Sequence, residues 1–130
     1  MSATTQRRGS ILMEDAVVLE HRAFEGDQYI LRVRAPRCAA AARPGSFAHV
    51  TCDPELPMRR PLSIMRADPV AGTVDFLYKI VGHGLTLLSR RKTGDRVSVL
   101  GPIGQPFRPR RERPRALLVG GGVGIPPMVF

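Results

Sequence analysis

A four-residue segment, Arg60-Pro61-Leu62-Ser63, brings a guanidinium, a rigid proline and a hydroxyl into one short stretch. The planar fork of an arginine suits a diphosphate because it donates two parallel hydrogen bonds. A serine hydroxyl can both donate to and accept from a nitrogen of a heteroaromatic ring. In a strand, Arg60 and Leu62 would project to one side, and Pro61 and Ser63 to the other. Taken alone, the segment is weak evidence, and an edge strand with an ordinary surface arginine is the favoured interpretation.

A second segment, residues 77–86, passes from a strand pattern through Gly82-His83-Gly84 into a short helical pattern. This order directs backbone N–H groups and the start of a helix toward an anion. Thr86 adds a hydroxyl, and Lys79 adds a positive charge. The alternative is a glycine-rich corner between a strand and a helix with no ligand, and the segment alone does not decide between the two.

The last fifteen residues predict the opening of a nucleotide-binding unit. An apolar run at 116–119 is followed by five residues from Gly120 to Gly124, four of them glycine, and then by Pro126 and Pro127. An apolar strand that leads into clustered glycines is typical of a phosphate-binding turn, and proline suits the first turn of a following helix. A strand–helix–strand unit needs about thirty residues. We therefore expect one domain followed by only the beginning of a second.

Between these segments, apolar and polar residues alternate with a period of two, which predicts strands. In residues 73–81, one face carries Val74, Phe76, Tyr78 and Ile80. Residues 84–91 change to a helical period, whereas the alanines at 39–42 are expected to form a loop or an edge. Six short strands favour a closed barrel over an open sheet. They are expected at residues 15–20, 28–34, 47–52, 60–65, 73–81 and 96–100.

The predicted fold class is therefore mainly β. It is a six-stranded antiparallel Greek-key barrel with one short helix, followed by the first strand and glycine turn of an incomplete α/β nucleotide-binding domain. We expect the barrel domain at residues 11–107, a basic linker at 108–115 and the start of the second domain at 116–130.

Composition favours a soluble globular protein, because 43% of the 130 residues are hydrophobic and no long apolar stretch is present. The first ten residues lack the apolar core of a signal peptide. Cys38 and Cys52 do not have the spacing of a disulfide scaffold or a metal cluster. We expect reduced thiols, one in a loop and one in the core, in a cytoplasmic protein. The three histidines likewise show no metal-ligand spacing, and no metal site is expected.

The net charge of +9 comes mainly from arginine, and five arginines crowd residues 108–115. Such a run fits a surface for nucleic acid or another polyanion. It also fits a solvated, proline-containing linker between two domains. The linker is favoured because the aromatic residues that would stack on bases are scarce.

Five motifs appear in the order and approximate spacing of one known group of flavoproteins; they lie at residues 44–47, 60–63, 78–82, 101–104 and 120–127. On these motifs, the chain from about residue 13 to residue 130 resembles the flavin-binding module of the ferredoxin–NADP reductase superfamily. Within it, Arg-Arg-Pro-Leu-Ser-Ile at 59–64 and Gly-Gly-Gly-Val-Gly-Ile-Pro-Pro at 120–127 look most like the electron transfer subunits of dihydroorotate dehydrogenase.

The resemblance implies a bound FAD. Arg60 would pair with its diphosphate, and Ser63 would hydrogen-bond the isoalloxazine ring near N5. Further contacts are implied along the ring, the ribityl chain and the start of the helix, from Pro61, Leu62, Leu77, Tyr78, Lys79, Gly84, Leu85 and Thr86. The glycine turn would hold part of NAD(P) through Gly121, Gly122, Val123 and Gly124. Leu62 stands where many relatives have a tyrosine, and Leu85 where they commonly have a threonine.

The resemblance also implies an oxidoreductase subunit of pyrimidine biosynthesis that passes electrons from NAD(P)H through FAD to a 2Fe-2S cluster, whose ligands would lie beyond this chain. The cofactor carries the chemistry, so no side chain is expected to act as a catalytic acid or base. A catalytic partner subunit of the dihydroorotate dehydrogenase type is expected, and a membrane or nucleic acid is not. Three alternatives stay open: another NAD(P)H–flavin reductase, or a hydrogenase or sulfite reductase subunit, of the superfamily; a basic barrel that binds nucleic acid; and a folded fragment inactive in turnover.

Overall fold

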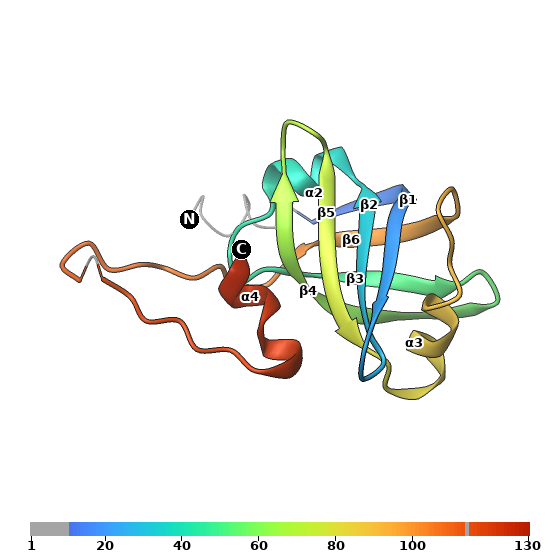
Figure 1. Ribbon diagram of the computed structural model, residues 1–130. Helices are drawn as coiled ribbons and strands as arrows, with labels where there is room; N and C mark the ends of the chain where they lie inside the picture. Colours follow the sequence, from blue (N-terminus) through green and yellow to red (C-terminus); the bar gives the residue numbers. More distant parts are fainter. Residues whose placement is uncertain (1–10, 114) are drawn as a thin grey trace.

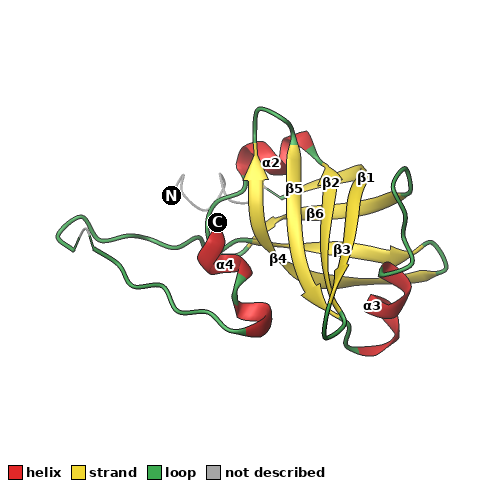
Figure 2. Cartoon of the chain, viewed as in Figure 1, coloured by secondary structure: helices red, strands yellow, loops and turns green. Residues whose placement is uncertain are grey.

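Six strands form a closed barrel in the computed structural model, which describes residues 11–113 and 115–130 (Figure 1, Figure 2). Around the barrel the strands follow the order β1-β2-β5-β4-β3-β6, and every neighbouring pair is antiparallel. Strands that are not consecutive in sequence therefore pair with each other, as a Greek key requires. The predicted barrel is confirmed. Its strands are β1 (Leu12–Phe24), β2 (Gln28–Arg34), β3 (Phe47–Asp53), β4 (Leu56–Asp68), β5 (Thr73–Lys79) and β6 (Arg96–Ile103).

Alternation along each strand separates the interior of the barrel from its surface. On β5, the side chains of Val74, Phe76 and Tyr78 are at most 2% exposed, as predicted for that face. Leu31 and Val33 of β2 are fully buried beside them. Apolar side chains fill the interior of the barrel.

The alanine-rich segment forms a helix, α2 (Pro36–Ala41), so the predicted loop or edge is wrong. Proline suits the first turn of a helix, and alanine has the highest helix propensity. The cap comes from β1, where the Glu14 carboxylate accepts hydrogen bonds from the N–H groups of Arg37 (2.8 Å) and Cys38 (2.9 Å). Glu14 lies 23 residues before Arg37, so a local pattern could not reveal this cap.

Both cysteines are free and buried. Cys52 lies in β3 and packs in the core as expected, whereas Cys38, expected in a loop, lies on α2. Burial raises the pKa of the Cys38 thiol to about 12, and the carboxylate of Glu14 adds to the effect. Burial also raises the pKa of Cys52. Both thiols are therefore protonated and unreactive near neutral pH.

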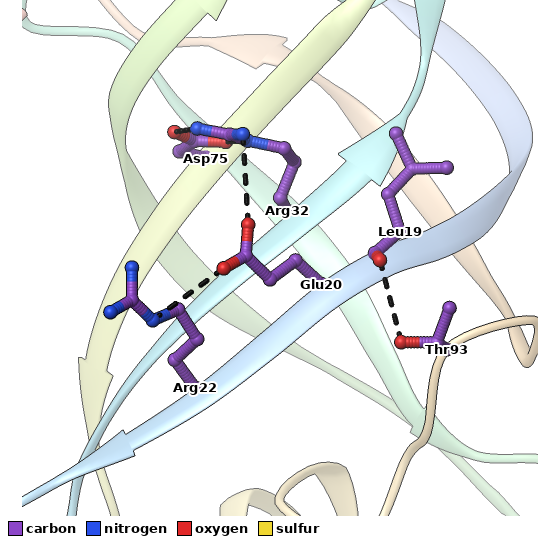
Figure 3. A network of polar contacts seen from close by, with 6 residues as sticks. All are labelled: Leu19, Glu20, Arg22, Arg32, Asp75 and Thr93. Carbon is purple, nitrogen blue, oxygen red and sulfur yellow. Dashed lines mark hydrogen bonds and ion pairs between the residues drawn. The ribbon is translucent and has the colours of Figure 1, made fainter.

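A network of ion pairs covers the outer face of β1, β2 and β5 (Figure 3). Arg32 donates two hydrogen bonds, of 2.8 and 3.0 Å, to the carboxylate of Asp75, which is only 4% exposed. This bond raises the pKa of Arg32. Glu20 lies 3.6 Å from Arg32 and 3.5 Å from Arg22. Charges thus alternate across three neighbouring strands and favour their observed register.

Helix α3 (Gly82–Leu88) follows β5 and packs against β3 and β4 at one end of the barrel (Figure 1). It confirms the helical period expected in this region, although it begins two residues before residue 84. Leu88 is completely buried and joins the barrel core. The helix therefore holds the glycine segment against the first half of β4.

The C-terminal part departs from the prediction. Residues 116–119 form no strand, and Leu117 and Val119 are 90% and 79% exposed. A strand of a parallel sheet exists only through hydrogen bonds to neighbouring strands, and this segment has none in the described chain. A 3₁₀ turn, η1 (Gly122–Gly124), contacts β5, and a short helix, α4 (Pro126–Val129), begins at a proline as expected and packs against β4.

Candidate cofactor site

Strands β4 and β5 separate partway along the barrel wall. Their pairing runs from Asp68–Thr73 to Ile64–Phe76. Past that last pair, the described residues of β4 pair only with β3, and those of β5 pair only with β2. The two strands therefore present facing edges, which we call the β4–β5 split. All predicted flavin contacts on strands lie beyond this point, at residues 60–63 and 77–79.

Arg60 and Gly84, predicted from separate motifs, lie against each other. Arg60 is half-buried on β4, opposite Val50 of β3. A Cβ at Gly84 would lie 2.8 Å from the Arg60 Nε and 3.4 Å from its Cγ, so a larger residue there would displace the Arg60 side chain from its observed position. The Nε is buried and has no hydrogen-bond partner among the described residues. An unpartnered buried donor costs free energy unless a ligand satisfies it.

The other residues of the β4 motif divide between the two faces of the strand as predicted. Pro61 is exposed and Ser63 half-buried on the outward side, whereas Leu62 is 5% exposed and packs in the core. Proline lacks a backbone N–H, which suits a strand edge without a partner. Ser63 lies opposite Phe47 of β3, at the point where the split begins. Its hydroxyl is the outward polar group of the motif nearest to that point.

The β5 residues also divide. Leu77 is half-buried and Lys79 exposed, whereas Tyr78 is 2% exposed and points into the barrel. Leu77 directly follows the last residue of β5 that pairs with β4. Leu77 and Lys79 therefore share the outward face, and Tyr78 offers that face only its backbone.

Tyr78 belongs to a partly buried polar network that the sequence did not reveal. Its hydroxyl lies 2.7 Å from Nε2 of His21, whose Nδ1 lies 2.8 Å from the carbonyl oxygen of Arg91. The Tyr29 ring stacks on the Tyr78 ring, with centroids 5.5 Å apart. Burial raises the pKa of Tyr78. Residues 57 and 70 positions apart meet here, and a histidine without metal-ligand spacing gave no sign of it.

The start of α3 places its predicted residues unequally. Gly84 is buried against Arg60, while Leu85 and Thr86 are half-buried. The Thr86 hydroxyl donates a 2.9 Å hydrogen bond to the carbonyl oxygen of Gly82 within the same helix. This hydroxyl is already used as a donor, so it can serve a ligand only as an acceptor or after rotating.

The C-terminal glycine turn is open. Gly121, Gly122, Val123 and Gly124 are exposed, and Gly122 adopts a φ of +57° that favours glycine. No atom lies within 4 Å of a Cβ built at the three glycines of this turn. Because η1 contacts β5 and α4 contacts β4, the turn lies beside the two strands that form the split. Its backbone is accessible to a ligand.

Two further properties of the described chain bear on its chemistry. Residues 11–113 and 115–130 contain no group of three His, Cys, Asp or Glu side chains placed to hold a metal ion. None of the helices in these ranges has the length and apolar character needed to cross a membrane. What the site does offer is a cation with an unsatisfied donor, an outward hydroxyl and free strand edges.

Known proteins resemble this chain over most of its length. No family model matches it. The electron transfer subunit of dihydroorotate dehydrogenase B (NAD(+)) from Desulforamulus reducens is 38% identical over 120 residues, which cover 89% of this chain and 45% of the relative. The subunit of the same name from Bacillus velezensis is 47% identical over 89 residues, 65% of this chain and 35% of the relative. The chain thus spans less than half the length of these relatives.

Solved structures share the barrel. The ferredoxin reductase in carbazole 1,9a-dioxygenase matches with a TM-score of 0.78 and 30% identity, over 92% of this chain and 38% of that one. The FAD apo form of the same reductase matches with a TM-score of 0.73 and 31% identity, over 92% and 39%. The barrel therefore has the ferredoxin reductase-like fold.

Proposed function

We propose that this chain, a homologue of the electron transfer subunits of dihydroorotate dehydrogenase B, holds FAD on its barrel as part of an oxidoreductase. It would take electrons from a nicotinamide dinucleotide and pass them to a catalytic partner subunit. The observation that carries the proposal is the unpartnered Nε of Arg60, held against Gly84 beside the β4–β5 split.

The diphosphate of FAD fits the Arg60–Gly84 contact. An arginine carries five N–H donors in a fixed fork, and phosphate oxygens accept them as strong charge-assisted hydrogen bonds. Gly84 keeps the backbone close to the guanidinium, because any side chain there would displace it. An anion at this point would satisfy the buried Nε and remove the penalty that the empty donor carries. Arg60 therefore binds and positions the diphosphate.

The isoalloxazine ring fits the β4–β5 split. Its polar edge carries both donors and acceptors, and an unpaired strand edge offers backbone groups of both kinds. Ser63 adds a hydroxyl on the outward face, and Leu77 adds an apolar surface across the split. Ser63 would orient the ring and bias the proton affinity of the nitrogen that it contacts. Pro61 and Lys79 would flank the ring, and Leu62 would support it from the core.

FAD, when bound, supplies two-electron exchange with a nicotinamide and one-electron exchange with a later carrier. The residues of this chain would bind and orient FAD and keep water from one side of it, and we assign none of them a role as acid or base. Gly121, Gly122, Val123 and Gly124 would contribute backbone N–H groups to part of the nicotinamide dinucleotide. We assign no residue of this chain to an iron–sulfur cluster.

The test is an FAD titration of the purified chain, followed by visible absorbance after gel filtration. Arg60→Ala should weaken FAD binding by about 1.5–3 kcal/mol, roughly ten- to a hundredfold, because a charge-assisted hydrogen bond is lost. Its neighbour Arg59 provides a matched control, since Arg59 donates to the Ser98 hydroxyl (2.8 Å) and carbonyl (3.1 Å) of β6 instead. Arg59→Ala should leave FAD affinity within about twofold.

Circular dichroism of both variants separates a binding defect from unfolding. Equal FAD affinity in Arg60→Ala and the wild type would refute the diphosphate site. Equal losses of FAD affinity in Arg59→Ala and Arg60→Ala would show that any nearby positive charge supports binding and that Arg60 has no specific role.

A further inference from the structure

Within the described residues, some arginines of the barrel region have carboxylate partners, whereas the arginines that follow the barrel have none. On the barrel, four arginines pair with carboxylates of the same chain: Arg22 with Glu20, Arg32 with Asp75, Arg91 with Asp53 and Arg96 with Asp15 (Figure 3 shows the first two). Residues 108–115, which we call the arginine loop, carry five arginines and a single acid. Among the described residues, none of these five makes an ion pair with a carboxylate.

The arginine loop extends away from the barrel. In Figure 1 the chain leaves the barrel after β6, runs outward and returns to α4. Its described residues are all exposed, and a turn is closed by a 3.1 Å hydrogen bond from the N–H of Arg113 to the carbonyl oxygen of Arg110. Pro106 and Pro109 restrict the backbone. The positive charges are therefore held in solvent on a partly stiffened segment, which lowers the entropic cost of binding.

The base of the arginine loop lies near the β4–β5 split. The N–H of Phe107 donates a 2.9 Å hydrogen bond to the carbonyl oxygen of Pro44, which ties the loop to the entry of β3. The first residue of β3, Phe47, lies between Ile103 of β6 and Ser63 of β4. A partner held by the loop would thus approach the barrel at the end where the split begins.

We infer that the arginine loop is an electrostatic docking surface for an acidic face of the catalytic partner subunit, an inference that rests on the proposed function. Unpaired arginines recognise carboxylates through their planar fork. A concentrated charge of one sign raises the rate of encounter with a surface of opposite sign. Docking beside the split would bring the electron acceptor close to the cofactor. A protein fits better than nucleic acid, because residues 108–115 contain no aromatic side chain for stacking on bases.

The test compares two variants of the full chain with equal charge. In the loop variant, Arg108, Arg110, Arg111 and Arg113 are each changed to Gln. In the control variant, four exposed arginines that form no ion pair within the described residues are changed to Gln. They lie on the barrel, on α2 and in the loop after α2, namely Arg34, Arg66, Arg37 and Arg43. Four positive charges are removed in each case, which takes the net charge from +9 to +5.

Association with the purified dihydroorotate dehydrogenase catalytic subunit of the same organism is measured by biolayer interferometry at low and high salt. At low salt, the loop variant should associate about tenfold more slowly than the wild type, and its rate should depend less on salt. The control variant should stay within about twofold of the wild type. Both variants should keep wild-type FAD affinity, because Arg60 and Gly84 are unchanged.

Three results would overturn the inference. The first is equal slowing, or no slowing, in both variants. The second is a loop variant that loses binding to single-stranded DNA but associates normally with the catalytic subunit, which would make the loop a nucleic-acid surface. The third is a wild-type chain that does not associate with the catalytic subunit at any salt concentration. Normal FAD binding in that case would leave the cofactor proposal standing, so the two failures are distinguishable.

Discussion

The barrel and the C-terminal segment, residues 104–130, differ in how many of their backbone, apolar and charged groups find partners within the chain. In the barrel every strand has two neighbours, the interior is filled, and Arg32 and Arg96 each pair with a carboxylate of a neighbouring strand. In the C-terminal segment, Leu117 and Val119 are exposed, no strand forms, and the arginines have no acidic partner among the described residues. Apart from the β4–β5 split, the barrel is held together by contacts within it, whereas the C-terminal segment exposes side chains that other molecules can contact.

The two regions meet at few points. Pro126 is buried, and Phe130 packs against the core cluster of the barrel. These contacts hold η1 and α4 beside β5 and β4, while the arginine loop between them and β6 stays in solvent. The site proposed for FAD lies on the barrel side of this boundary, and the surfaces proposed for the nicotinamide and the partner lie on the other. Substitutions can therefore test stability on one side and recognition on the other.

The largest expected contrast is between a core residue and an exposed apolar one. Phe76→Ala should lower the free energy of unfolding by about 3–5 kcal/mol, because it removes a fully buried ring from a filled interior. Leu117→Ala should change it by less than about 0.5 kcal/mol, since that side chain is 90% exposed. Urea unfolding followed by circular dichroism measures both. Phe76→Leu, expected to cost about 1–2 kcal/mol, serves if the alanine variant does not fold. A large loss in Leu117→Ala would mean that residues 116–119 are covered.

A smaller contrast is expected between two ion pairs of the barrel. Asp75→Asn should lower the free energy of unfolding by about 1–2 kcal/mol, because a buried carboxylate loses its two charge-assisted hydrogen bonds. The loss is expected to be no larger because the Arg32 side chain is 43% exposed and solvent screens the pair. Asp15→Asn should have little effect, since both side chains of the Asp15–Arg96 pair are more than 60% exposed. Urea unfolding at low salt and with about 1 M sodium chloride compares them. Equal costs would contradict the assignment of Asp75 as the buried anchor.

Much of the barrel could be predicted from sequence, because the strands of an antiparallel barrel alternate between apolar residues that face the interior and polar residues that face solvent. Residues 73–81 illustrate this: the pattern puts Tyr78 on the same face as Val74 and Phe76, and the structure agrees. The family resemblance groups Tyr78 with Leu77 and Lys79 at the flavin, and only the latter two share the outward face. The alternation of apolar and polar residues predicts which way each side chain points. A sequence motif identifies only a segment, and that segment can contact a ligand through its backbone instead of its side chains.

What could not be predicted depends on contacts distant in sequence. The first N–H groups of helix α2 donate hydrogen bonds to a carboxylate of β1. The Tyr78 hydroxyl forms a hydrogen bond with His21, 57 residues away. The strand expected at 116–119 is absent for a related reason, since a strand needs hydrogen-bonded neighbours and residues 11–113 and 115–130 supply none to this segment. The Arg60–Gly84 contact brings together two motifs that were each ambiguous alone, and their proximity is what supports the proposed diphosphate site.

The smallest effect should appear in alkali and should come from the barrel alone. Burial raises the pKa of Cys38 from its ordinary value of 9.0 to about 12. Below pH 9 the thiol is protonated in both the folded and the unfolded chain, so its contribution to the free energy of unfolding is fully present. As the pH rises above 9, the unfolded chain loses the proton first, and alkali favours unfolding. The free energy of unfolding should begin to fall near pH 9 and should continue to fall toward about pH 12. Its slope should approach about 1.4 kcal/mol per pH unit for this one group.

Urea unfolding at several pH values, compared between the wild type and Cys38→Ala, measures this slope. The variant should lose most of the dependence below pH 10; Cys52, whose pKa burial also raises, would account for the remainder. Tyr78 adds its own loss only above its ordinary pKa of about 10. An unchanged slope in Cys38→Ala would mean that water reaches α2, and the barrel would then be less closed at that end than its buried thiol indicates.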